Sequence, residues 1–172
     1  MTQIGVAIAV PEPYGSELRR TRASLGDPQA ATVPSHVTLL PPDDVGDSHL
    51  VAVREALAQV AARTAPFEMS LQGTGTFRPV SPVVFVAVSR GISETELLAS
   101  CLREAVKSPP PLFPFHPHVT VAQHLDADGL DRAYCELAGF SCDFTVEEFC
   151  LYLHDETAGW QPETCFRLTG TG

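Results

Sequence analysis

Hydrophobic and polar positions along this chain alternate between two periods, and both periods recur in each half. Residues 4–10 form a short apolar run closed by a proline, which is typical of a strand. Residues 16–25 fit a short helix that ends at a glycine. Residues 33–40 form a second apolar strand, which we expect Pro41 and Pro42 to end.

The later elements continue this alternation of strands and helices. Asp47 or Ser48 can cap a helix with apolar residues at helical spacing, namely Leu50, Val53, Leu57 and Val60. Strands are expected at residues 67–71, 74–77, 83–88, 144–153 and 165–168. Helices are expected at residues 93–107 and 126–137.

Length and composition describe one globular domain over residues 1–172. An apolar fraction of 44% with 19% charged residues is ordinary for such a domain. No apolar run reaches the length of a membrane span, and the first residues lack the pattern of a secretory signal. We therefore expect a cytoplasmic protein, with no membrane partner.

The cysteines change this picture little. Their number is odd and their spacing never follows C-x-x-C; they are Cys101, Cys135, Cys142, Cys150 and Cys165. We expect neither a disulfide framework nor a cysteine zinc cage. Apolar neighbours indicate small buried side chains rather than reactive thiols.

Charge limits the partners. The net charge is −10, and the chain has ten arginines but a single lysine, Lys107. Binding along an extended nucleic acid depends on many Lys and Arg contacts, which this composition disfavours. A nucleic-acid ligand is therefore expected to be a short piece or a chain end.

A weak internal repeat carries the candidate chemistry. The pattern histidine, any residue, threonine occurs twice, each time shortly after a proline. The two copies are His36 with Thr38 and His118 with Thr120. The two histidines stand 82 positions apart, nearly half the chain. Two similar lobes that face each other would bring the motifs together across a groove.

Strand geometry determines what each motif presents. Residues i and i+2 of a strand point to the same face, so each histidine projects with its threonine. Two imidazoles can serve as base and acid on opposite sides of a phosphorus, because their ordinary pKa is near neutrality. Threonine hydroxyls can donate to the non-bridging oxygens, where negative charge gathers. The set suits cleavage of a cyclic phosphodiester without a metal.

With both motifs identified, the sequence resembles the 2H phosphoesterase superfamily. It resembles most closely the bacterial branch of 2′-5′ RNA ligases and RNA 2′,3′-cyclic phosphodiesterases. The similar segments cover nearly the whole chain and include the opening strand and residues 36–40, 73–77, 83–88 and 115–122. Residues 115–122 carry the most specific similarity, because members of this family often have Pro-His followed by any residue, a threonine and a hydrophobic residue.

This resemblance implies a fold and an activity. The fold would be α+β and bilobal, with two pseudo-symmetric lobes, antiparallel sheets around a central cleft and helices outside. The activity would be metal-independent opening of 2′,3′-cyclic phosphates, on RNA ends or small cyclic nucleotides, to 2′-phosphates without a cofactor. Joining through 2′-5′ bonds is the same reaction in reverse. His36 would be the acid and His118 the base, although the repeat makes these roles exchangeable. We expect a monomer.

Other residues are candidates for substrate contacts beside Thr38 and Thr120. Arg78 is either a phosphate contact or a solvated surface arginine. Four aromatic residues can stack on a base or serve in packing: Phe85, Phe115, Tyr14 and Trp160.

Two alternative functions remain open. A metal-dependent hydrolase could use His116 and His118 with His36, but Pro117 separates the pair and no acidic residue has ligand spacing. A non-catalytic module on the same scaffold would bind a nucleotide or phosphate without turnover. The intact set of two histidines and two threonines favours the enzyme.

Overall fold

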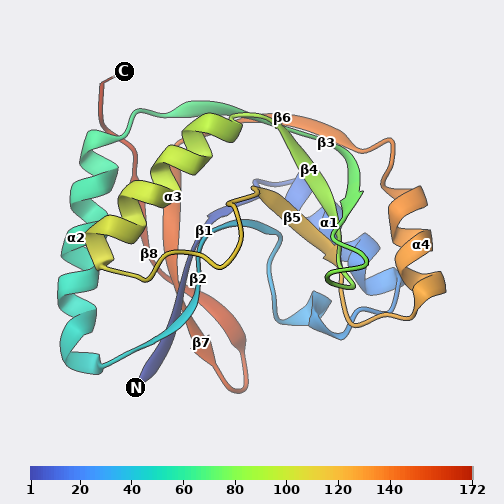
Figure 1. Cartoon of the computed structure of the whole chain (residues 1–172), viewed down its shortest axis with the longest axis horizontal. Coiled ribbons are helices and arrows are strands. Elements are labelled where there is room, and N and C mark those ends of the chain that lie inside the picture. The colour runs from blue at the N-terminus through green and yellow to red at the C-terminus, as the bar shows by residue number, and fades with distance from the viewer. Residues whose placement is uncertain (172) are drawn as a thin grey trace.

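A computed structural model describes residues 1–171 as a single curled sheet with helices packed against it (Figure 1). The strands are β1 (Thr2–Ala9), β2 (His36–Val45), β3 (Phe67–Thr76), β4 (Val84–Arg90), β5 (His118–Ala122), β6 (Ser141–Val146), β7 (Glu148–Asp155) and β8 (Gly159–Arg167). The helices are α1 (Tyr14–Ser24), α2 (Leu50–Arg63), α3 (Ile92–Val106) and α4 (Ala127–Glu136). Two short 3-10 turns, η1 (Pro28–Ala31) and η2 (Asp47–His49), precede β2 and α2.

The sheet order is β6-β3-β4-β5-β2-β1-β7-β8, and every neighbouring pair is antiparallel. The expected α+β class with antiparallel strands is confirmed. The two halves of the sheet are continuous, because β2 pairs with β5 where Val37 lies opposite Val119. The first half contains β2, β1, β7 and β8, and the second contains β5, β4, β3 and β6.

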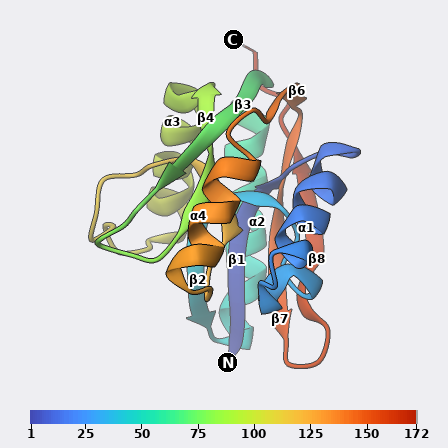
Figure 2. The same cartoon turned by 90° about the vertical axis from the view of Figure 1, so that its right-hand side faces the viewer.

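The helices connect the two halves. In Figure 1, α2 and α3 lie side by side to the left of the view, and α1 and α4 lie to the right; Figure 2 shows α1 and α4 from that side. Helix α1 follows β1 in the chain but packs on β5 of the second half. Helix α3 follows β4 but packs on β2 of the first half. Each motif strand is therefore supported by a helix that starts from the other half.

Residue alternation gives the sheet two different faces. In β1, Ile4, Val6 and Ile8 are buried in the main core, whereas Gly5 and Ala7 face the other way. We call the side of Ile4, Val6 and Ile8 the core face, and the opposite side the site face. Buried residues from the helices complete the core, including Leu18, Leu57, Leu98, Leu102 and Leu130.

Two expected boundaries are wrong for the same reason. Pro41 and Pro42 do not end β2, which continues to Val45. The ladder between β1 and β2 shifts register at this point, and both prolines are exposed, so no ladder hydrogen bond is required of them. The two strands expected between residues 67 and 77 are likewise one strand, β3 (Phe67–Thr76), because Gly73 adopts a φ of 69° within a register shift of this strand.

Another boundary differs near the C-terminus. The expected strand at residues 144–153 is divided into β6 and β7, which lie far apart in the sheet. The final strand is longer than expected and begins at Gly159, where it forms a hairpin with β7. Across residues 1–171, no helix is both long and apolar enough to cross a membrane.

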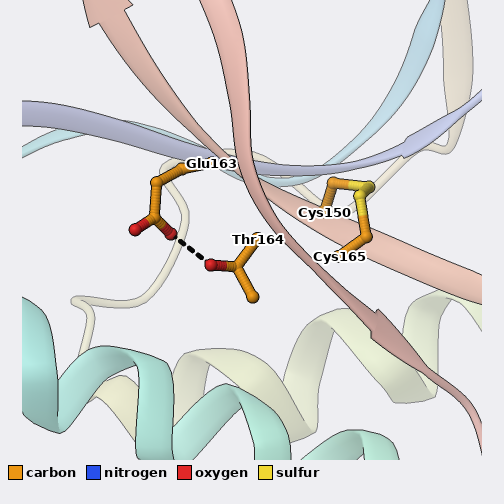
Figure 3. The surroundings of a disulfide bond; sticks show 4 residues. All are labelled: Cys150, Glu163, Thr164 and Cys165. Carbon is orange, nitrogen blue, oxygen red and sulfur yellow. Dashed lines mark hydrogen bonds between the residues drawn. A yellow bond between two sulfur atoms is a disulfide. The ribbon is translucent and has the colours of Figure 1, made fainter.

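The structure contradicts the expectation that no cysteine forms a disulfide. Cys150 and Cys165 lie directly opposite each other on β7 and β8, and their sulfurs are bonded (Figure 3). The expected burial also fails for Cys101, Cys135 and Cys165, which are exposed, whereas Cys142 and Cys150 are buried. An odd cysteine count did not reveal the pair, because strand register determines which cysteines meet.

We predict that the disulfide stabilises the β7–β8 hairpin. The bond closes a loop of 15 residues, for which chain entropy alone gives about 3 kcal/mol. Reduction, or the double substitution Cys150→Ser and Cys165→Ser, should lower the free energy of unfolding by about that amount in urea titrations. Cys101→Ser is the matched control and should behave as the wild type. An unfolding midpoint indifferent to reductant would contradict the prediction.

Candidate active site

The two histidines of the repeat stand at the starts of neighbouring strands. His36 begins β2 and His118 begins β5. Because Val37 pairs with Val119 in an antiparallel ladder, His36 lies toward Thr120 and His118 lies toward Thr38. All four of these side chains are half-buried, whereas both valines are fully buried. The structure thus brings both motifs together on the site face.

Each imidazole is held by the same backbone contact. Nδ1 of His36 lies 2.6 Å from the carbonyl oxygen of Pro34, and Nδ1 of His118 lies 2.6 Å from that of His116. A carbonyl oxygen only accepts, so Nδ1 must carry the proton in both rings. Nε2 is then the nitrogen left to exchange a proton with a ligand.

Burial sets the protonation of both rings. Loss of solvent lowers the pKa of His36, the hydrogen bond to Pro34 opposes that shift, and the positive charge of Arg22 adds to it. Loss of solvent also lowers the pKa of His118, against its hydrogen bond to His116. The charges of His116 and His36 lower the pKa of His118 further. Since protonated His36 disfavours a second charge on His118, the pair favours one proton over two.

Aromatic rings surround His118. Its ring centroid lies 4.9 Å from that of Phe77, edge to face, and 5.3 Å from that of Phe85. Phe85 is buried and lies across Gly75, where a Cβ atom would be only 2.5 Å from the ring. Phe85 therefore packs against His118. Of its two expected uses, stacking on a base and packing, the structure shows packing.

A pocket opens beside His36 on the same face. Its lining includes two small residues of β1, the first motif on β2, and two aromatic residues of β7 and β8: Gly5, Ala7, His36, Thr38, Tyr152 and Trp160. The remaining lining is apolar and comes from Val6, Val33, Pro34, Leu40 and Pro42. Trp160 thus lies at the site, whereas Tyr14 packs against the main core.

Two further candidates are engaged within the protein. The guanidinium of Arg78 donates to Thr76 at 3.2 Å and to the exposed carboxylate of Asp131 at 2.8 Å. Arg78 follows Phe77 in sequence, so it lies near the second motif. Phe115 is partly buried and packs against the main core.

Sequence reasoning missed Tyr152 and Arg22. Tyr152 lies in β7, and the small residues at every second position of β1 were the available signal for a pocket beside it. Arg22 is 5% exposed and pairs with the buried carboxylate of Asp27 at 2.8 Å. Asp27 also accepts from the backbone N–H of Gln123, directly after β5. No local pattern marks this arginine, because its burial depends on α1 docking against β5.

The three histidines considered for a metal do not converge. Within residues 1–171, the one group of three potential ligands whose atoms lie within 4.8 Å of one another is Glu148, Cys150 and Cys165. The two sulfurs of that group are bonded to each other and provide no thiolate. His36, His116 and His118 form no such group there.

The fold and the paired motifs are those of the two-histidine phosphoesterases, and a comparison of sequences shows the family. The sequence model of the 2′-5′ RNA ligase superfamily matches residues 10–158, and the chain belongs to this family. A Bacillus cytotoxicus protein provisionally named a phosphoesterase is 28% identical over 144 residues, which cover 83% of each chain. A similarly named Bacillus thuringiensis protein is 29% identical over 146 residues, again 83% of each chain.

Solved structures share the fold. A Thermus thermophilus protein superposes with a TM-score of 0.72 at 23% identity, over 99% of this chain and 100% of that one. E. coli LigT, in complex with NADP+, gives a TM-score of 0.70 at 24% identity over 98% of both chains. Crystal structures of LigT with 3′-AMP, ATP and phosphate are also similar.

We predict that the two site histidines titrate below pH 6.5 and influence each other. Their imidazole protons, followed by NMR, should show midpoints under the ordinary value of 6.5 because burial disfavours the charged rings. His36→Gln should raise the pKa of His118, since it removes a nearby positive charge. His49→Gln should not, because His49 is exposed and is not among the groups that shift His118. A His118 midpoint unmoved by His36→Gln would refute the coupling.

Proposed function

We propose that this protein is a metal-independent 2′,3′-cyclic phosphodiesterase, with His36 and His118 as its proton-transfer pair. The observation that carries the proposal is the pairing of the two motif strands at Val37 and Val119. This pairing supports the proposal because both imidazoles lie on one face. In each ring Nδ1 is bound to a backbone carbonyl, which leaves Nε2 for proton transfer. Two such groups provide both proton transfers that opening of a cyclic phosphate requires.

The reaction assigns one step to each histidine. Nε2 of His118 takes a proton from water as the water oxygen bonds to phosphorus. The bond from phosphorus to the 3′ oxygen breaks on the opposite side, and that oxygen takes the proton from Nε2 of His36. The product is a 2′-phosphate, and proton exchange with solvent restores the starting state. Family resemblance favours this assignment, although the internal repeat makes the two roles exchangeable.

The threonines and the charge balance complete the proposal. Thr38 and Thr120 lie on the same face as the imidazoles and can donate to the non-bridging oxygens. A net charge of −10 disfavours a long polyanion, so short RNA ends and small cyclic nucleotides are the expected substrates. LigT, which shares the fold, has been crystallised with ATP and 3′-AMP. Joining of 2′-5′ bonds would be the reverse reaction.

We predict that His36→Gln and His118→Gln each lower kcat for a nucleoside 2′,3′-cyclic phosphate by roughly 10²–10⁴-fold. Glutamine fills a similar space and cannot exchange a proton, so both variants should fold normally by circular dichroism. Phosphorus NMR of the product should show a 2′-phosphate.

Controls distinguish the alternative functions. His49→Gln should retain full activity, because His49 lies outside the site. Wild-type activity should survive a strong chelator, whereas its loss would indicate a metal-dependent hydrolase. Nucleotide binding without turnover, unchanged in His36→Ala, would indicate a non-catalytic binding module.

We predict a bell-shaped dependence of kcat/KM on pH, displaced to the acidic side. The active form has one protonated and one neutral imidazole, and both pKa values are lowered by burial. The alkaline limb follows loss of the last imidazole proton, so its midpoint should lie below pH 6.5. A rate that rises steadily toward high pH would rule out a histidine acid.

A further inference from the structure

The two halves of the sheet repeat a backbone plan but differ in what occupies their site faces. In each half, a glycine on a strand near the motif leaves room above the sheet: Gly75 in β3 and Gly5 in β1. The side chains above these glycines decide whether that room is filled or open.

The second half is filled by its own side chains. The Phe85 ring lies directly over Gly75, and the Phe77 ring packs on it with centroids 4.5 Å apart. Both rings contact the imidazole of His118. Nothing the size of a ring can enter on this side without displacing them.

The first half also has an aromatic ring over its glycine, but it keeps a pocket beside that ring. Gly5 and Ala7 of β1 form a floor between His36 on β2 and Tyr152 on β7. The Trp160 ring covers Gly5, with its atom Cζ3 3.4 Å from the position of a Cβ there, so the pocket lies beside the indole and not between the indole and Gly5. The pocket volume of about 80 Å³ is several times the ~10–15 Å³ that one ordered water needs. There is room for a flat group beside the indole.

We propose that this pocket binds the nucleobase of the cyclic nucleotide, with the base stacked on Trp160. The inference rests on the proposed function, in which His36 protonates the 3′ oxygen of the ribose as its bond to phosphorus breaks. The sugar and its base then lie on the His36 side of the phosphorus. The pocket is on that side, and the corresponding space beside His118 is occupied by Phe77 and Phe85.

The pocket lining indicates what kind of base it accepts. Apart from His36 and Tyr152, the lining contains no ionisable side chain, so an uncharged ring is favoured over a charged group. Stacking on an aromatic ring tolerates any base, because each base has a π-face. We expect adenine and uracil derivatives both to bind, with little discrimination between them.

The chain provides its own probe for the test, because Trp160 is its single tryptophan. Adenosine 2′-monophosphate, the product of the proposed reaction, should quench tryptophan fluorescence in the wild type and in His36→Gln. Inorganic phosphate should leave the fluorescence unchanged. This readout needs no turnover, so it separates failure of base binding from failure of catalysis.

Variants locate the binding. Trp160→Ala should lower the affinity for adenosine 2′-monophosphate by roughly 10-fold or more in calorimetry, because the stacking contact is lost. The affinity for inorganic phosphate should not change. Gly5→Val places methyl groups against the Trp160 ring, because a Cβ there lies only 3.4 Å from Cζ3. It suits a strand and keeps the fluorophore, so it should weaken nucleotide binding similarly and tests the pocket if Trp160→Ala does not fold. Phe113→Ala, which removes an exposed aromatic ring outside the pocket lining, should bind as the wild type.

Three results would overturn the inference. The first is unquenched fluorescence at saturating nucleotide, and the second is nucleotide affinity unchanged in Gly5→Val. The third is an equal loss of phosphate and nucleotide binding in the pocket variants, which would mean that the pocket holds the phosphate and not the base. Base binding without hydrolysis of any cyclic phosphate would refute the proposed function alone.

Discussion

The backbone pairing at Val37 and Val119 is the contact on which the whole site depends. It joins two half-sheets that are distant in sequence, and it places the polar faces of both motifs side by side. Both valines are completely buried, so the junction is supported by core packing. Helices α1 and α3 strengthen it, because each packs on the motif strand of the half from which it does not come. A shift of one residue in either strand would turn its histidine and threonine into the core.

Burial and hydrogen bonding act in opposite directions on the two imidazoles. Loss of solvent favours the neutral rings, while the carbonyls of Pro34 and His116 favour the charged ones and fix the ring orientation. Burial dominates in both, and protonated His36 disfavours a second charge on His118. The proposed proton transfer needs one charged and one neutral imidazole, and this repulsion disfavours the doubly charged pair. The same contact two residues before each histidine shows that the internal repeat extends to hydrogen-bond geometry.

The side chains of the two halves differ, so the site has a pocket on the His36 side and packed rings on the His118 side. Phenylalanine rings fill one half, whereas the other keeps a pocket beside Trp160, lined by Ala7 and His36. The disulfide supports the side with the pocket. Thr38, Ala7, Cys150 and Cys165 stand opposite one another in successive strands, so the sulfur bridge joins the hairpin that carries the aromatic wall.

The sequence alone determined the two motifs, the face each presents and the α+β class, because strand and helix periods are local properties of the chain. Local signals failed at Pro41 and Gly73, where neighbouring strands accommodate the residue in a register shift. The Cys150–Cys165 bond, the burial of Arg22 and the place of Trp160 above Gly5 were decided only by the tertiary structure. Each of these depends on which strands and helices become neighbours, and that is set by the packing of the whole core rather than by adjacent residues.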